Sequence, residues 1–195
     1  MQSQKRLRDE LRFVSEFHTL CDVIQQGAVS RLARIEEHAA HAPLLTDMLR
    51  REFFPLVPRS ADRHPLVRGG ARGRMLIVMT SDEGLVGPLH GEVVRRAQAL
   101  AARDTRWVMV GQRGVRLLGS HAGSVRVMPM PAEDAADVCL RRLSQLVLQE
   151  FSRDHLQDVL LVAPHFVSTT HQDVVSQVVL PVPCQLTAAL DGPQE

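Results

Sequence analysis

Several short groups of residues in this 195-residue chain could do chemistry, and the turn at residues 81–87 has the strongest pattern. It reads Ser-Asp-Glu-Gly-Leu-Val-Gly and follows an apolar run, which is where α/β proteins place ligands. The turn lacks the Gly-x-Gly-x-x-Gly spacing of a dinucleotide loop and the Gly-Lys-Ser/Thr ending of a P-loop. Asp82 and Glu83 are adjacent, so their carboxylates point in different directions and do not form an acid and base pair. We interpret the turn as a surface that recognises another protein.

The other candidate sites are weaker. His38 and His41 are three residues apart in a helical pattern, but two ligands do not make a zinc site. Cys139 lies in an apolar helical run, which favours a core thiol over a nucleophile. The Gly-Gln-Arg-Gly stretch at residues 111–114 imitates the loop that clamps nucleic acid in KH domains, yet a tight turn between a strand and a helix explains both glycines. We expect no catalytic residue, no metal and no cofactor.

The composition favours a soluble cytoplasmic protein and gives no sign of nucleic-acid binding. The 23 lysines and arginines nearly balance the 22 aspartates and glutamates, and tyrosine is absent, so neither a basic field nor a stacking platform is evident. Three scattered cysteines fit thiols in a reducing compartment, namely Cys21, Cys139 and Cys184. No run approaches the roughly 18 to 20 apolar residues that cross a bilayer. We expect no direct membrane span and no nucleic-acid partner.

The first element that must position these residues is a long helical pattern at residues 1–54. One heptad position holds Leu7, Val14, Cys21, Ala28, Ile35, Ala42 and Leu49. The complementary position holds Leu11, His18, Gln25, Leu32, Ala39 and Thr46. We predict one imperfect coiled-coil helix with a kink near Pro43. The alternative is two or three ordinary core helices joined by turns at Gly27 and Pro43.

Residues 55–73 are rich in proline, glycine and arginine, which is typical of a linker. From residue 74 the apolar period changes, and short β-branched runs alternate with amphipathic segments of helical length. The predicted strands are residues 75–80, 107–111, 124–128 and 158–163. The predicted helices are residues 89–103, 112–119 and 132–152, and residues 166–180 are predicted to be extended or mixed.

This alternation predicts an α/β domain at residues 74–190 with a Rossmann-like, mostly parallel open sheet. The polar tail at residues 191–195 is expected to fray. The amphipathic pattern of the last helix predicts a buried side made of Val138, Leu140, Leu143, Leu146, Val147 and Phe151.

Three stretches, in this order, resemble the gamma subunit of F-type ATP synthases. Residues 79–89 are similar to the family's strand that ends in Ser-Asp-Arg-Gly-Leu-Cys-Gly-Gly-Leu. Residues 110–114 are similar to its Gly-x-Lys-Gly turn, and residues 159–181 are similar to its strand, Phe-x-Asn-Thr and Gln-x-Leu-Leu-Pro sequence. The N-terminal helical pattern also lies where the family has its first long helix.

The resemblance implies a non-catalytic central-stalk rotor that couples ion flow to ATP synthesis or hydrolysis in the catalytic head. The implied partners are the alpha, beta and epsilon subunits and the membrane c-ring, with the chain peripheral to the inner (plasma) membrane through the complex. The residues expected to bind partners are Leu7, Leu11, Val14, Cys21, Ala28, Leu32, Ile35, Ser81, Asp82, Glu83, Gly84, Leu85 and Gly87.

The chain also departs from the family pattern. Glu83 stands where the family has arginine, and Val-Gly-Pro at residues 86–88 replaces Cys-Gly-Gly. Family members continue in a second long helix after Leu-Pro, whereas this sequence stops soon after Pro181, so that helix is truncated, absent or replaced. A second hypothesis is a shortened gamma-like paralogue that acts as a coiled-coil scaffold or regulatory interaction protein. A third, a small nucleotide-binding enzyme, lacks a phosphate loop.

Overall fold

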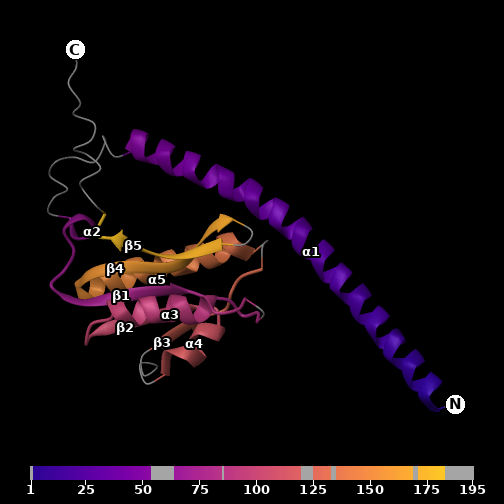
Figure 1. The fold of residues 1–195 in the computed structure, drawn as a ribbon. Coiled ribbons are helices and arrows are strands. Elements are labelled where there is room, and N and C mark those ends of the chain that lie inside the picture. The colour runs from indigo at the N-terminus through magenta and orange to yellow at the C-terminus, as the bar shows by residue number, and fades with distance from the viewer. Residues whose placement is uncertain are drawn as a thin grey trace. The chain divides into compact units, whose positions relative to one another are not determined.

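The computed structural model divides the chain into two units, Met1–Val57 and Pro58–Glu195 (Figure 1). The described residues are 2–53, 64–84, 86–119, 125–132, 135–168 and 171–182. Within the first of these ranges, side chains are described for residues 4–29, 32 and 48. The domain boundaries drawn from the sequence remain a prediction, and both the tail at residues 191–195 and Cys184 lie outside the described residues.

The first unit contains helix α1 (Gln2–Phe53), whose 52 residues span about 78 Å at 1.5 Å per residue. The helix runs without interruption through Gly27 and Pro43, so the chain has one helix here instead of several joined by turns. Ion pairs between residues four apart add a few tenths of a kcal/mol each, namely Arg6 with Glu10, Arg12 with Glu16 and His18 with Asp22. The kink near Pro43 remains a prediction.

The second unit is an α/β domain with a five-stranded sheet in the order β3-β2-β1-β4-β5. Its strands are β1 (Arg72–Met79), β2 (Thr105–Val110), β3 (Val125–Met128), β4 (Leu156–Ser168) and β5 (His171–Leu180). Its helices are α2 (Pro65–Arg68), α3 (Leu89–Leu100), α4 (Arg113–Leu118) and α5 (Ala136–Asp154). Strands β1 to β4 pair in parallel and β5 pairs antiparallel with β4, which confirms the predicted fold class.

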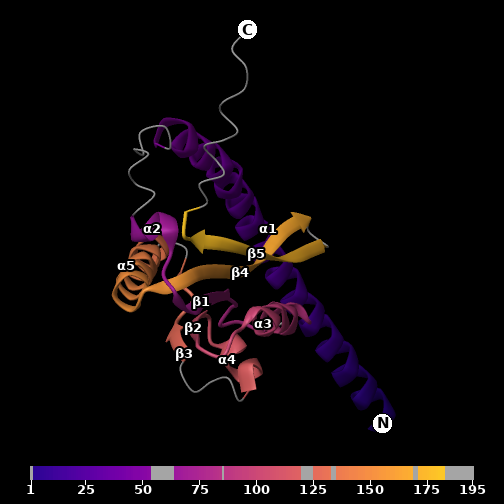
Figure 2. The same ribbon diagram turned by 90° about the vertical axis from the view of Figure 1, so that its left-hand side faces the viewer.

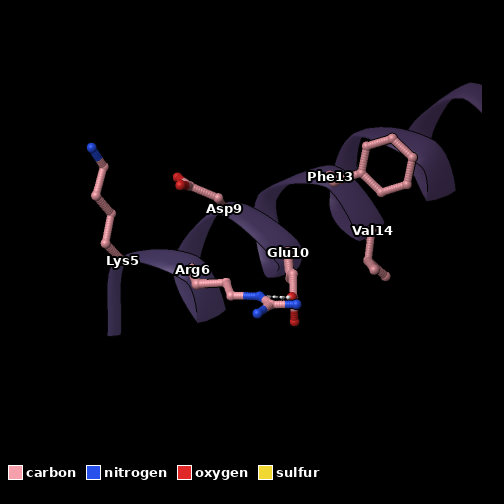
Figure 3. Close-up of a pocket in the computed structure, with 6 residues that line it drawn as sticks. All are labelled: Lys5, Arg6, Asp9, Glu10, Phe13 and Val14. Atoms are coloured by element: carbon pink, nitrogen blue, oxygen red, sulfur yellow. Dashed lines mark hydrogen bonds and ion pairs between the residues drawn. The ribbon is translucent and has the colours of Figure 1, made fainter. Parts of the chain in front are cut away.

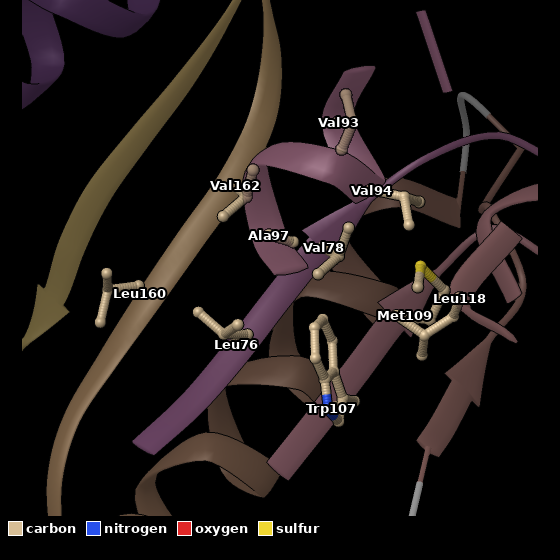
Figure 4. Packing of buried hydrophobic residues seen from close by; sticks show 10 residues of the cluster. All are labelled: Leu76, Val78, Val93, Val94, Ala97, Trp107, Met109, Leu118, Leu160 and Val162. Carbon is tan, nitrogen blue, oxygen red and sulfur yellow. The ribbon is translucent and has the colours of Figure 1, made fainter. Parts of the chain in front are cut away.

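Helices cover both faces of this sheet, with α3 and α4 on one side and α5 on the other (Figure 2). Successive side chains of the central strand β1 alternate between the faces. Leu76 and Val78 pack with Trp107 and Met109 against α3 (Figure 4). The other face, with Met75 and Ile77, packs against α5. A strand buried on both faces needs a continuous apolar run, which explains the sequence of β1.

The structure differs from the prediction in three places. Helix α2 and the start of β1 lie inside the segment predicted as a linker. Helix α2 forms there because Pro65 begins it and the His64 side chain caps it by accepting from the Leu66 backbone N–H. Strand β4 is longer than predicted and forms a hairpin with β5. The expectation that Val138 and Leu140 are buried is wrong, because only the C-terminal half of α5 lies on the core.

The ion pair between Arg74 on β1 and Asp158 on β4 fastens two neighbouring strands. Both guanidinium contacts, from Nε and Nη2 to the two carboxylate oxygens, measure 2.7 Å. Nη1 also donates to the Leu100 carbonyl at 2.8 Å, which ties the end of α3 to the same arginine. The hydrogen bonds to Asp158 raise the pKa of Arg74 despite the opposing effect of its burial. While Asp158 is ionised, Arg74 therefore stabilises the fold at pH values below its ordinary pKa, and this contribution is lost as the pH rises through its raised pKa.

We predict that Asp158→Asn lowers the free energy of unfolding by about 2 kcal/mol, because a partly buried guanidinium loses its charged partner. Asp173→Asn is the matched control, since the pair between His171 and Asp173 is exposed and contributes less than about 0.5 kcal/mol. Urea denaturation at pH 7 measures both changes. Equal effects of the two substitutions would contradict the prediction.

Candidate partner-binding surfaces

The carboxyl ends of β1, β2 and β3 meet at one edge of the sheet, and Asp82 ties the loops that follow them. Its Oδ1 accepts from the Gln112 backbone N–H at 2.6 Å, and its Oδ2 accepts from the Met130 backbone N–H at 2.8 Å. Arg113 Nε donates to the Asp82 carbonyl at 3.3 Å, and its backbone N–H donates to the Ser81 carbonyl at 3.1 Å. Both carboxylate oxygens of Asp82 are therefore used to hold backbone in place.

Next to Asp82, the loops that follow β1 and β2 approach so closely that Gly111 and Gly114 have no space for a Cβ. The buried Thr80 hydroxyl lies 3.0 Å from the carbonyls of Val110 and Gly111, and it accepts from the Gly114 backbone N–H at 3.3 Å. Gly111 has φ +90°, and a Cβ there would lie 2.7 Å from the Thr80 carbonyl carbon. A Cβ on Gly114 would lie 2.6 Å from the Thr80 methyl group. These close approaches explain both glycines without any role in clamping nucleic acid.

Ser81 and His90 form a second small group at the same edge. Ser81 Oγ donates to the Glu83 carbonyl at 2.8 Å and lies 3.1 Å from His90 Nε2. A nucleophilic serine needs a histidine that a third group orients. Among the described residues, no carboxylate contacts His90. The serine and histidine therefore shape the turn, and the arrangement gives no support for nucleophilic catalysis.

The predicted recognition turn is consequently divided between two roles. Ser81 and Asp82 are half-buried and hold the turn, whereas Glu83 and Gly87 are exposed. Gly84 is half-buried beside the Arg113 guanidinium, and Leu85 lies outside the described residues. Sequence reasoning missed Arg113 and Met130 as partners of the turn, because they follow other strands and only the sheet brings them together. A partner that contacts this edge would meet the exposed part of the turn.

The predicted seam of α1 is open to solvent along its described part. Leu7, Leu11 and Val14 are 58, 62 and 61% exposed, and the smaller Cys21 and Ala28 are exposed as well. Leu32 is half-buried, and the side chain of Ile35 lies outside the described residues. The side chains of His38 and His41, the candidate metal ligands, also lie outside them. An apolar row this exposed needs a partner if it is to be removed from water.

Helix α1 carries a second apolar row that the predicted site left out. Phe13, Phe17, Leu20 and Ile24 follow the same three-and-four spacing in an offset register and are 55 to 68% exposed. The Phe13 and Phe17 rings stack with their centroids 6.4 Å apart. The signal was present in the sequence as a shifted heptad, so the apolar face of α1 is broader than a single seam.

A hollow of about 660 Å³ lies on the N-terminal part of α1, where the row of Phe13 begins (Figure 3). Its lining comes from one helix alone and comprises Lys5, Arg6, Asp9, Glu10, Phe13 and Val14. A small-molecule site is normally a concavity that encloses most of its ligand. Side chains of a single helix enclose nothing, so the hollow is part of the open apolar face.

The described residues provide neither a metal site nor a membrane-spanning helix. Among them, no group of three His, Cys, Asp or Glu residues could hold a metal ion. None of the helices in the described part of the chain has the length and apolar character needed to span a membrane. The described residues therefore offer two surfaces for contact, the exposed part of the turn on the α/β domain and the exposed apolar face of α1.

The sequence model of the ATP synthase family matches residues 3–194. Among curated relatives, the chain is 25% identical to the ATP synthase gamma chain of Erythrobacter litoralis and 23% identical to that of Halothermothrix orenii. These alignments cover 94 and 93% of this chain and 68 and 66% of the two relatives. The chain thus spans about two thirds of their length. It belongs to the ATP synthase family.

Solved structures include a similar chain in the Tetrahymena thermophila mitochondrial ATP synthase central stalk and c-ring. That chain is 16% identical, with 76% of this chain and 74% of that chain covered and a TM-score of 0.45. A chain in the Euglena gracilis mitochondrial ATP synthase rotor is 13% identical, with a TM-score of 0.46 and 83 and 67% coverage.

We predict that Asp82→Asn destabilises the α/β domain by about 2 kcal/mol, because one of two charge-assisted bonds is lost and an amide N–H faces a backbone N–H. Glu83→Gln, one residue away and exposed, changes stability by less than about 0.5 kcal/mol. Denaturation measures both, and hydrogen exchange should be faster at the Gln112 and Met130 amides in the first variant only. Unchanged exchange at those two amides would argue against the tie.

Gly111→Ala and Gly87→Ala separate steric overlap from backbone strain. Both glycines have positive φ, +90° and +58°, but a Cβ on Gly87 would have no atom within 4 Å. We expect Gly87→Ala to cost about 1 kcal/mol and Gly111→Ala to cost at least about 3 kcal/mol, because only the latter forces backbone apart. Thermal unfolding compares the two, and similar costs would show that the loops can relax.

Proposed function

We propose that this chain is a non-catalytic rotor that couples ion flow to ATP synthesis or hydrolysis by turning inside a catalytic head. The observation that carries the proposal is the apolar face of α1, which is exposed from Leu7 to Val29 over about 33 Å of helix. A rotor must present a continuous surface to several neighbours in turn, and a long helix with two apolar rows provides one. Coupling of this kind is a free-energy linkage between distant sites, and it needs no chemistry in the rotor itself.

The lack of catalysis is supported by how the polar groups are used. Asp82, Thr80 and Ser81 are the groups best placed for chemistry at the ligand-binding edge of the sheet, and each is bonded to backbone. A catalytic acid, base or nucleophile must have a free side chain that reaches its substrate. These residues therefore build the turn and leave nucleotide chemistry to other subunits.

We assign α1 to the alpha and beta subunits and the α/β domain to the epsilon subunit and the c-ring. The two described rows of α1 suit apolar partners, because the nearby charges of Arg6, Glu10, Arg12 and Glu16 are paired within the helix. The exposed residues Glu83 and Gly87 offer the α/β domain a contact at a turn whose base Asp82 fixes. The chain would then be peripheral to the inner (plasma) membrane through the complex, on its cytoplasmic side.

Affinity purification of the tagged full-length chain from its native cells tests the proposal. Recovery of alpha, beta and epsilon subunits in fixed stoichiometry, with ATPase activity in the eluate, is the expected result. Recovery of a homodimer held together through α1, without these subunits, would favour a coiled-coil scaffold. Nucleotide binding by the isolated chain at one-to-one stoichiometry would favour an enzyme and overturn the proposal.

We predict that the double variant Phe17→Gln, Ile24→Gln reduces recovery of alpha and beta subunits about tenfold or more, because it removes two large apolar side chains from the contact. The matched control is Gln4→Asn, Thr19→Gln, which changes two exposed polar residues of α1 and should leave recovery unchanged. Circular dichroism confirms that both variants stay helical. Normal recovery with the Phe17 and Ile24 variant would show that the second row contacts nothing in the complex.

A further inference from the structure

The two edges of the sheet differ in how they are protected. The β3 edge is four residues long and carries Arg126, which pairs with Glu150 at 3.1 Å. The β5 edge is ten residues long, and its last seven residues read Val-Val-Ser-Gln-Val-Val-Leu without a charge or a proline. Natural proteins shorten, charge or cover the edges of their sheets, because an open edge pairs with other chains. Residues 174–178 of β5 pair regularly with β4 and carry no charge or proline, whereas Asp173 lies before them and a register shift at Val179 follows them.

The hairpin of β4 and β5 also extends past the rest of the sheet. Strand β4 pairs with β1 only as far as Val162, whereas it pairs with β5 as far as Ser168. Residues 163–168 and 171–175 therefore form a two-stranded ribbon within the described part of the chain (Figure 1). An isolated two-stranded ribbon is marginally stable in water. A third strand would stabilise it.

The exposed side chains of β5 indicate what kind of partner fits. Val178 pairs with Leu160 and lies on the face that α3 covers, whereas Val175 pairs with Ala163 and lies on the opposite face. They are 45 and 41% exposed. A helix docked on one face would cover only one of these valines. A strand added at the edge would contact both, and it would also bond the outward N–H and C=O groups.

We propose that the outer edge of β5 binds an extended strand of another polypeptide, which continues the sheet beyond β5. The strand has an uncharged apolar segment of about seven residues, to match residues 174–180. The inference rests on the proposed function only in that the strand is sought in a subunit of the assembled complex.

Hydrogen exchange of the full-length chain, alone at two concentrations and in the complex purified from native cells, tests the proposal. In the isolated chain the outward amides of residues 173–178, every second residue along this regular part of β5, should exchange rapidly at both concentrations. In the complex the same amides should exchange at least tenfold more slowly. Val178→Lys should remove this protection, because a lysine on an edge strand opposes pairing, while Val178→Thr should keep it. Val138→Lys, on the exposed part of α5, is the matched control and should keep it too.

Each other outcome overturns the proposal. Slow exchange in the dilute isolated chain would mean that another part of this chain covers β5, and slow exchange only at high concentration would mean that a second copy does. Rapid exchange in the complex would mean that nothing pairs there. If alpha and beta subunits are present and β5 is unprotected, the strand is absent but the rotor function stands. Protection of β5 in a complex that lacks the alpha and beta subunits would support the added strand and contradict the rotor function.

Discussion

The burial of β1 on both faces is the constraint on which the α/β domain depends. Met75, Leu76, Ile77 and Val78 are all buried, and no residue of the strand between Arg74 and Met79 can face water. Two hydrophobic clusters must therefore form, one on each face, and helices must supply their outer walls. Parallel pairing follows, because each helix lies between consecutive strands and returns the chain to the same end of the sheet.

Parallel pairing in turn places three loops at one edge, and that crowding determines what their polar residues do. The loop after β1 contacts the loops after β2 and β3, whose backbone N–H groups need acceptors. Asp82 supplies two oxygens, and Thr80 supplies a hydroxyl that three backbone groups share. The motif that first suggested a ligand site is therefore mainly a solution to a packing problem, with its exposed end left for contact.

Much of the fold could be predicted from periodicity, because the strands in the middle of the sheet have apolar runs that only burial explains. Residues 75–80 were predicted as a strand, and β1 covers Arg72–Met79. The hairpin of β4 and β5 was missed, since edge strands are half exposed and their apolar pattern is weak. Val138 and Leu140 show the same limit, because periodicity gives the face of a helix and not the length of core beneath it. The partners of Asp82 lie 30 and 48 residues away and depend on the register of the sheet.

The two units differ in where their stability can come from. The α/β domain encloses its own apolar side chains, and hydrophobic burial of about 1.5 to 3 kcal/mol for each large one offsets its ordering entropy. In residues 4–29 of α1 the large apolar side chains stay more than half exposed, so this part of the helix gains little from burial and relies on its backbone and a few ion pairs. The proposed rotor function would place other chains over these two rows, and their burial would then stabilise the helix. The domain that follows α1 in sequence differs, because its apolar side chains pack into clusters of its own.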